Sequence, residues 1–329
     1  MTTMNATSAP VADHRIGSLG RLTIRLAAAE LRLAASPGDR VVVRTPNGAT
    51  LPDRVVVETL DGGLTIREEE SLGSIVGRGR RTVQLEIEVP ANAEVTIDAA
   101  SGWLDGRGLR GTQRYRVVSA ETRLVEAAGR IELSTVSGDA TIELADTAEL
   151  ALKSVSGDVA VRGGRIGGLR IGSTSGDIRI ESPLVGRSGN TVETLSGDVS
   201  LVAIAGLRVE ARTISGDLTT NLPHRSEGRM GRRTLIVGDG SIELGFRSVS
   251  GDLRIHGAAA ASSAAAEPAA SGDPTAPADP ADAERMAILR ALERGELDVP
   301  TAMDRLAVLD ATPETDVVAE NSGREGGDV

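Results

Sequence analysis

The tripeptide Ser-Gly-Asp returns at a nearly fixed interval through the middle of this 329-residue chain. Its six serines are Ser137, Ser156, Ser175, Ser196, Ser215 and Ser250, and steps of 19 to 21 residues separate the first five. The last step, of 35 residues, is close to two periods. Altered copies precede the series at Ser101-Gly102-Trp103 and Ser119-Ala120-Glu121. A period near 19 predicts a solenoid, in which each unit buries its apolar face only against its neighbours.

Apolar and polar residues alternate around each tripeptide, which is the pattern of a β-strand with one buried face. In the copy Val155-Ser156-Gly157-Asp158-Val159, Val and Gly are predicted to point inward, and Ser and Asp outward. An apolar residue also lies four residues before each serine. It is three residues from the inward residue that precedes the serine, so strict alternation would place the two on opposite faces, and the chain must turn a corner between these two residues. The inward glycines leave room where the backbone bends or packs closely; they are Gly138, Gly157, Gly176, Gly197, Gly216 and Gly251.

These patterns predict an all-β fold: a single-stranded parallel β-solenoid of about nine coils over residues 16–256, with a small C-terminal α-helical hairpin. Residues 1–15 are expected to be a disordered N-terminus. The Ala-rich stretch Leu26 to Ala35 could be helical. Residues 257–280 are rich in Ala, Ser and Pro and predict a flexible linker.

A helical pattern follows the linker over residues 281–311, and residues 312–329 are expected to form a disordered acidic tail. Two short helices cannot make a stable core alone, so they need a partner: the solenoid itself, a second copy of the chain or another protein. The residues predicted to form this docking face are Met286, Leu289, Leu292, Met303 and Leu306.

Composition narrows the functional classes. The chain carries 36 Lys and Arg against 47 Asp and Glu, a net charge of −11, which argues against general nucleic-acid binding. It has no cysteine, which excludes disulfides, thiolate metal sites and a thiol nucleophile. No apolar run approaches the length of a transmembrane helix and no secretory signal is recognisable. A cytoplasmic protein is therefore expected, with the cell surface, reached by an unrecognised route, as the alternative.

The spaced Ser-Gly-Asp strands resemble the bacterial putative-adhesin domain family over about residues 16–256. The segment around Leu292-Glu293-Arg294-Gly295-Glu296 is similar to the short helical hairpin often attached to such domains. The resemblance implies a β-solenoid of right-handed or similar form, and it implies oligomerisation or an envelope-stress context for the hairpin. It implies no catalytic mechanism and no cofactor.

The outward aspartates are the candidate site. Stacked coils would place Asp139, Asp158, Asp177, Asp198 and Asp217 in one column, about 4.8 Å apart. One interpretation is a calcium ladder, because carboxylate and hydroxyl oxygens are calcium ligands. The other interpretation, which we favour, is that each aspartate accepts backbone N–H hydrogen bonds in its turn.

No cluster of residues points to an active site, and no cofactor is expected. His14, His224 and His256 lie far apart, and the Asp and Arg residues recur with the repeat. We therefore expect a non-enzymatic binding or interaction scaffold, with a surface or glycan ligand left open. The alternatives are a structural polymer of rods joined end to end and, less favoured, a glycan-active β-helix enzyme.

Overall fold

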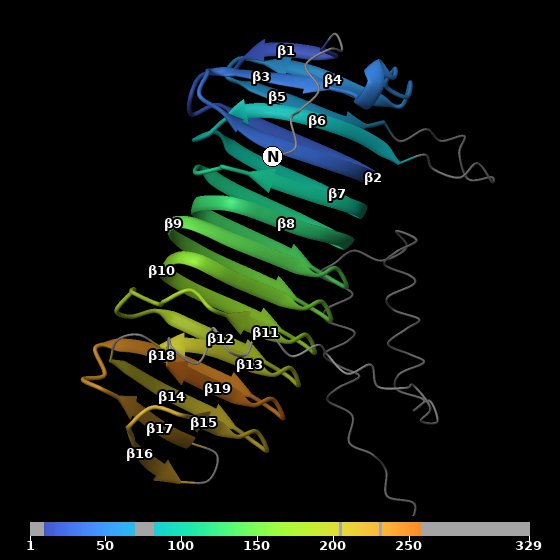
Figure 1. The fold of residues 1–329 in the computed structure, drawn as a ribbon. Coiled ribbons are helices and arrows are strands. Elements are labelled where there is room, and N and C mark those ends of the chain that lie inside the picture. The colour runs from blue at the N-terminus through green and yellow to red at the C-terminus, as the bar shows by residue number, and fades with distance from the viewer. Residues whose placement is uncertain (1–9, 70–81, 204–205, 230–231, 258–329) are drawn as a thin grey trace, which may run out of the picture. The chain divides into compact units, whose positions relative to one another are not determined.

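The computed structural model describes residues 10–69, 82–203, 206–229 and 232–257. Contacts divide the chain into two units, residues 1–269 and 270–329, and every described residue belongs to the first. That unit is built almost wholly of β-strands stacked in parallel coils (Figure 1). Its only helical element in the described ranges is the 3₁₀ turn η1 (Pro46–Gly48).

Four long strands form the regular middle of the solenoid: β7 (Glu94–Arg107), β8 (Thr112–Thr135), β9 (Ala140–Ser154) and β10 (Val159–Ser173). Each strand after β7 pairs in parallel with the one before it. Residues that follow each Asp make one face of the coils, here called face A; Val159, for example, pairs with Ala140. Residues that precede each Ser make face B, where Ile171 pairs with Leu152. The chain passes from face B to face A at the Ser-Gly-Asp corner.

Short strands continue both faces toward the C-terminal end, and their order in space departs from their order in sequence. The elements are β11 (Ile178–Ile180), β12 (Asn190–Thr194), β13 (Val199–Ala203), β14 (Leu207–Thr213), β15 (Leu218–Thr220), β18 (Ile242–Ser248) and β19 (Leu253–Gly257). On face B, β18 pairs with both β12 and β14, and on face A, β19 pairs with both β13 and β15. The last coil is therefore inserted between the two coils that precede it in sequence.

Antiparallel strands cover the outer edge of face B at this end. β17 (Arg232–Val237) pairs antiparallel with β14, and β16 (His224–Arg229) pairs antiparallel with β17. The 35-residue step in the repeat has a structural explanation. Between Ser215 and Ser250 the chain completes the outer coil, forms this antiparallel pair, and then returns to form the coil inserted between the two preceding ones.

The N-terminal end uses the same arrangement. β2 (Arg21–Ser36) pairs with β7 on one side, and with β5 (Gly63–Glu68) and β6 (Val83–Pro90) on the other. β3 (Arg40–Arg44) and β4 (Val55–Leu60) then cover β6 and β5 in antiparallel register. β1 (Ala12–Arg15) is added to β3. Ordered structure therefore begins before the predicted boundary at residue 16.

The core between the two faces is aliphatic, and two of the three aromatic side chains complete it. The apolar column four residues before each tripeptide is buried throughout, and Tyr115 and Phe246 within it are each 1% exposed. The hydroxyl of Tyr115 donates to Oε1 of Gln113 at 2.9 Å, and the Gln113 amide donates to the carbonyls of Leu109 and Ala128. Burial raises the pKa of Tyr115. The third aromatic, Trp103, lies on the outer surface of face A beneath the guanidinium of Arg32.

The predicted fold class is wrong in its helical component. The described residues form a β-solenoid-like stack, and no α-helix and no helical hairpin is seen among them. Residues 281–311, where that hairpin was expected, lie outside the described residues. The stretch Leu26 to Ala35 is strand and not helix, because it pairs on both sides with β6 and β7, and this pairing overrides the helix propensity of its alanines.

Two further differences concern regularity. The coils do not follow the sequence order at either end, and antiparallel strands are added at the N-terminal end and on face B at the C-terminal end, where parallel coils were expected. Within the described ranges, no helix is long and apolar enough to span a bilayer.

Candidate functional site

The aspartates of the repeat form a continuous hydrogen-bonded ladder along the Ser-Gly-Asp corner. In each step, the backbone N–H of one aspartate donates to Oδ1 of the aspartate in the adjacent coil. The donor–acceptor distances, from Asp158 onto Asp139 through to Asp217 onto Asp252, are 3.0, 2.9, 3.0, 3.2 and 2.8 Å. One oxygen of each accepting carboxylate is therefore used to join coils.

The order of this ladder follows the inserted coil. Asp252 donates to Asp198, and Asp217 donates to Asp252, so Asp252 lies between the two aspartates predicted to be neighbours. The other predicted members, Asp139, Asp158 and Asp177, adjoin in sequence order. All six belong to one column, with Asp217 at its outer end.

The second oxygens of the column face the surface. At Asp198 and Asp252 they accept from Arg254, at 2.7 and 3.2 Å, and the bond to Asp198 is the main cause that raises the pKa of Arg254. Asp139, Asp158 and Asp177 are exposed. Within the described ranges, no three His, Cys, Asp or Glu side chains come close enough together to hold a metal ion.

A hydroxyl two residues before each tripeptide serine was missed by sequence reasoning; it is buried in five of the six copies and partly buried at Thr213. In the second copy, Oγ of Ser154 accepts from the N–H of Gly157 at 3.0 Å and donates to the Gly157 carbonyl at 2.7 Å. Every copy has Ser or Thr there: Thr135, Ser154, Ser173, Thr194, Thr213 and Ser248. Because the hydroxyl recurs in all six copies, an alignment of the repeats would have revealed it.

The repeat glycines are required by close approach of the backbone between coils. A Cβ atom on Gly157 would lie 2.2 Å from the carbonyl oxygen of Gly138, and one on Gly176 would lie 2.2 Å from that of Gly157. Gly197, Gly216 and Gly251 make the same approach to the coil beside them, and Gly138 approaches Ala120. The tripeptide serines add a bond across coils, as when Oγ of Ser175 donates to the Val155 carbonyl at 3.2 Å.

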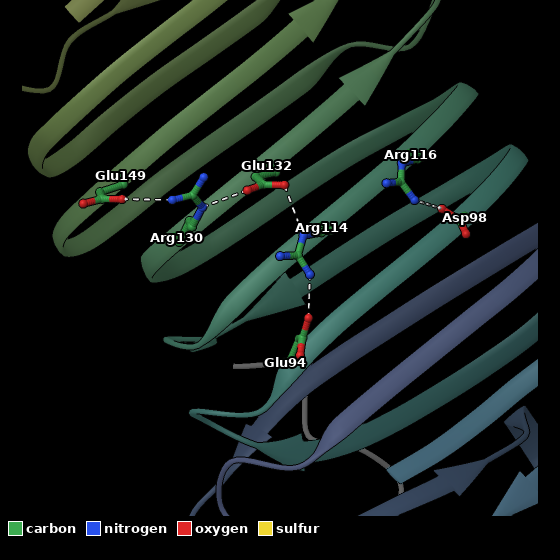
Figure 2. Close-up of polar contacts among 7 residues, drawn as sticks. All are labelled: Glu94, Asp98, Arg114, Arg116, Arg130, Glu132 and Glu149. Carbon is green, nitrogen blue, oxygen red and sulfur yellow. Dashed lines mark hydrogen bonds and ion pairs between the residues drawn. The ribbon is translucent and has the colours of Figure 1, made fainter. Parts of the chain in front are cut away.

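Face B carries a second ordered array, made of alternating charges (Figure 2). Arg114 bonds to Glu94 at 2.5 Å and to Glu132 at 3.1 Å. Arg130 continues the series from Glu132, at 2.7 Å, to Glu149, at 3.5 Å. A shorter series beside it joins Arg116 to Asp98 at 3.4 Å. The array spans strands β7, β8 and β9, so its charges tie neighbouring coils together.

The ionisation of this array follows from its contacts. Burial disfavours the charge of Glu94, but hydrogen bonds from Arg114 and Arg21 outweigh it and lower the pKa of Glu94. The bond from Arg130 is the largest cause that lowers the pKa of Glu132. Both carboxylates are therefore held charged at neutral pH, in a pattern that offers no proton donor for acid–base chemistry.

The predicted docking residues Met286, Leu289, Leu292, Met303 and Leu306 lie outside the described residues. What the described residues offer is an array of surface groups fixed by their neighbours: carboxylates along the corner and paired charges on face B.

A family model described as Toastrack DUF4097 matches residues 20–306. No curated protein matches the chain. Among solved structures, a "putative lipid binding protein" from Parabacteroides distasonis is 14% identical, with a TM-score of 0.40, and the match covers 74% of this chain and 95% of that one. A "putative adhesin" from Bacteroides fragilis is 11% identical, with a TM-score of 0.33 and the same coverage. A "putative cell adhesion protein" from Clostridium sporogenes is 11% identical, with a TM-score of 0.25, covering 75% of this chain and 98% of that one.

Proposed function

Because the chain belongs to the Toastrack DUF4097 family, we propose that it is a non-enzymatic interaction scaffold whose solenoid presents a rigid surface to partners. The observation that carries the proposal is the aspartate ladder, which repeats one hydrogen bond at 2.8 to 3.2 Å across six coils. A rigid surface loses little conformational entropy on binding, so it suits repeated, multipoint recognition.

The ends of the solenoid support a discrete particle over a polymer of rods. Exposed strand edges invite pairing with other chains. The outermost strands at the N-terminal end (β1 and β4) and on face B at the C-terminal end (β16) are only four to six residues long, and each runs antiparallel to its neighbour, so these edges do not continue the parallel stacking of the coils. At the C-terminal end of face A the edge strand is β15, which has only three residues. A short edge gives little length for end-to-end pairing.

We further propose that the apolar residues within 281–311 associate with a partner or with a second copy of the chain. The sequence alone supports this part. A contact there would combine two modules on one chain and raise their effective concentration for a shared target.

Light scattering over a hundred-fold concentration range tests both parts. We expect a defined mass for the full chain, and a lower mass after Met286→Ser, Leu289→Ser and Leu292→Ser together if the contact is between copies. Val185→Ser, which removes an exposed aliphatic side chain from the solenoid, is the matched control. Growth without limit would favour the polymer. If the full chain is monomeric, the residues are tested by capturing its partner with and without the triple substitution, and undiminished capture would contradict their role.

The non-enzymatic part has its own test. Purified protein incubated with acidic polysaccharides is expected to leave their chain length unchanged, measured by size-exclusion chromatography. Shortening that persists through re-purification and is lost on heating the protein would contradict the proposal.

A further inference from the structure

Three arginines lie side by side at the C-terminal end of face B. Arg212 on β14 is paired in register with Arg247 on β18 and with Arg232 on β17. All three side chains are exposed, and adjacent strands place neighbours about 4.8 Å apart. We call these residues the arginine row.

The charge of this row is only partly balanced. Arg247 pairs with Glu193 at 2.9 Å, whereas neither Arg212 nor Arg232 has an ion-pair partner among the described residues. Like charges directly opposite each other on a sheet are destabilising, so nothing in the folding of the sheet favours the row.

The acidic residues nearby are mostly engaged elsewhere. Oε1 of Glu210 lies 3.5 Å from Nε of Arg208, and Oδ1 of Asp217 lies 4.0 Å from a terminal guanidinium nitrogen of Arg233. Asp252 is bonded to Arg254. Glu227 pairs in register with Thr234, in the row beside the arginines. The excess positive charge is therefore concentrated on Arg212 and Arg232.

Exposed aliphatic side chains adjoin the row. Ile214 and Val249 follow Arg212 and Arg247 by two residues, and 80% and 40% of their surfaces are exposed. The two segments are neighbours, since the N–H of Ser215 donates to the Val249 carbonyl at 2.9 Å. Among the large apolar residues that the structure describes, Ile214 has the largest exposed fraction.

The negative net charge of the chain is carried almost wholly by residues 258–329. Residues 258–329 hold fifteen acidic residues and five basic ones, so the segment up to residue 257 is nearly neutral, with 31 basic and 32 acidic residues. Local groups therefore decide the potential at the arginine row.

We propose that this end of the solenoid binds the surface of an anionic phospholipid bilayer. Guanidinium groups match phosphate in planar, paired hydrogen bonds, and juxtamembrane basic residues are attracted to anionic lipid. Ile214 and Val249 would enter the boundary between headgroups and acyl chains, where apolar side chains gain by leaving water. A soluble polyanion would satisfy the arginines but would offer nothing to the aliphatic pair. The proposal goes beyond the scaffold function and does not depend on it.

Flotation of the full chain with vesicles tests this binding. Vesicles of 70% phosphatidylcholine and 30% phosphatidylglycerol are compared with pure phosphatidylcholine at 0.1 M salt. We expect binding to the anionic vesicles only, and a loss of about five-fold for each arginine removed, so about 25-fold for Arg212→Gln with Arg232→Gln. Ile214→Ser is expected to weaken binding about ten-fold.

Matched controls separate this site from general surface effects. Arg170→Gln removes an exposed arginine from face B in strand β10, and Leu19→Ser removes an aliphatic side chain that is 79% exposed at the other end of the solenoid. Both are expected to bind like the unaltered protein. Equal binding to both vesicle types, no binding, or equal losses in the controls would overturn the proposal. Binding to heparin that is insensitive to Ile214→Ser, without vesicle binding, would assign the row to soluble polyanions instead. Thermal melting checks that each variant is folded. If the variant with both Arg212→Gln and Arg232→Gln does not fold, Ile214→Ser alone still tests the proposal.

Discussion

The backbone N–H of Asp177 donates to Oδ1 of Asp158 at 2.9 Å, although nineteen residues separate them in sequence. The same relationship, repeated along the column, gives each aspartate a structural task at the coil junction. The carboxylate is an acceptor for the next coil and, at Asp198, also a partner for Arg254. The favoured interpretation, that each aspartate accepts backbone N–H bonds in its own turn, differs from these contacts in the position of the donor, which lies in the adjacent coil.

Substitution of Asp177 measures this task. Asp177→Ala removes the acceptor for the N–H of Asp198, and we expect the free energy of unfolding to fall by about 1 kcal/mol. Asp177→Asn keeps an amide oxygen there and should cost less. Urea denaturation, with and without calcium, is the measurement. A calcium-dependent stabilisation that disappears in Asp177→Ala would favour the calcium ladder.

The buried hydroxyl of Ser154 gives a sharper prediction. Ser154→Ala leaves the N–H and the carbonyl of Gly157 without their partner inside the protein, and should lower the free energy of unfolding by about 2 kcal/mol. Ser154→Thr should be nearly neutral, because Thr135 and Thr194 make the same contacts in their own coils. Equal losses in the two variants would mean that volume, and not the hydroxyl, matters at this position.

Gly157 tests the close approach of the coils. Gly157→Val would place Cβ 2.2 Å from the Gly138 carbonyl oxygen, and backbone atoms cannot move aside as a flexible side chain can. We expect a loss of several kcal/mol or failure to fold. Circular dichroism during thermal melting measures it, with Gly172→Val as the control, because nothing lies within 4 Å of a Cβ at Gly172. An unchanged melting temperature for Gly157→Val would contradict the coil geometry.

The charge array of face B predicts a pH dependence. The pKa values of Glu94 and Glu132 are lowered below 4.5 in the folded protein, so the unfolded chain binds protons first as the pH falls. Their contribution to stability is therefore complete above about pH 5 and is lost as the pH falls below 4.5 through their folded values. Urea denaturation at pH 6 and pH 3.5 should show a smaller loss in Glu132→Gln than in the unaltered protein. Identical losses in the two proteins would show that protonation of Glu132 does not contribute to the loss of stability at low pH.

The local pattern of the sequence was enough to place residues within a coil. Ser156 and Asp158 are exposed and Gly157 is buried, because strand alternation alone decides which face a residue occupies. The order of coils could not be obtained in this way. A step of 35 residues fits either an outer coil or an inserted one, and only long-range pairing of β18 with β12 and β14 distinguishes them.

The helical interpretation of Leu26 to Ala35 failed for a related reason. Alanine propensity is a local term of a few tenths of a kcal/mol per residue, whereas Leu31 and Leu33 are 1% exposed in strand β2 between two other strands. The hydroxyl at Ser154 was passed over because it stands at the corner, where the alternation changes phase and the parity of a residue does not reveal its burial.

The inserted coil is tested most directly by engineered disulfides, since the chain has no cysteine of its own. Ser200 on β13 is paired with Arg254 on β19, and Arg254 is paired with Thr219 on β15. Ser200→Cys with Arg254→Cys should form an intramolecular disulfide under mild oxidation. Ser200→Cys with Thr219→Cys should not, because two strand spacings, about 10 Å, exceed the reach of a disulfide. Mass spectrometry identifies the bridge that forms. A bridge only between positions 200 and 219 would contradict the order of the coils and the discrete particle proposed from it.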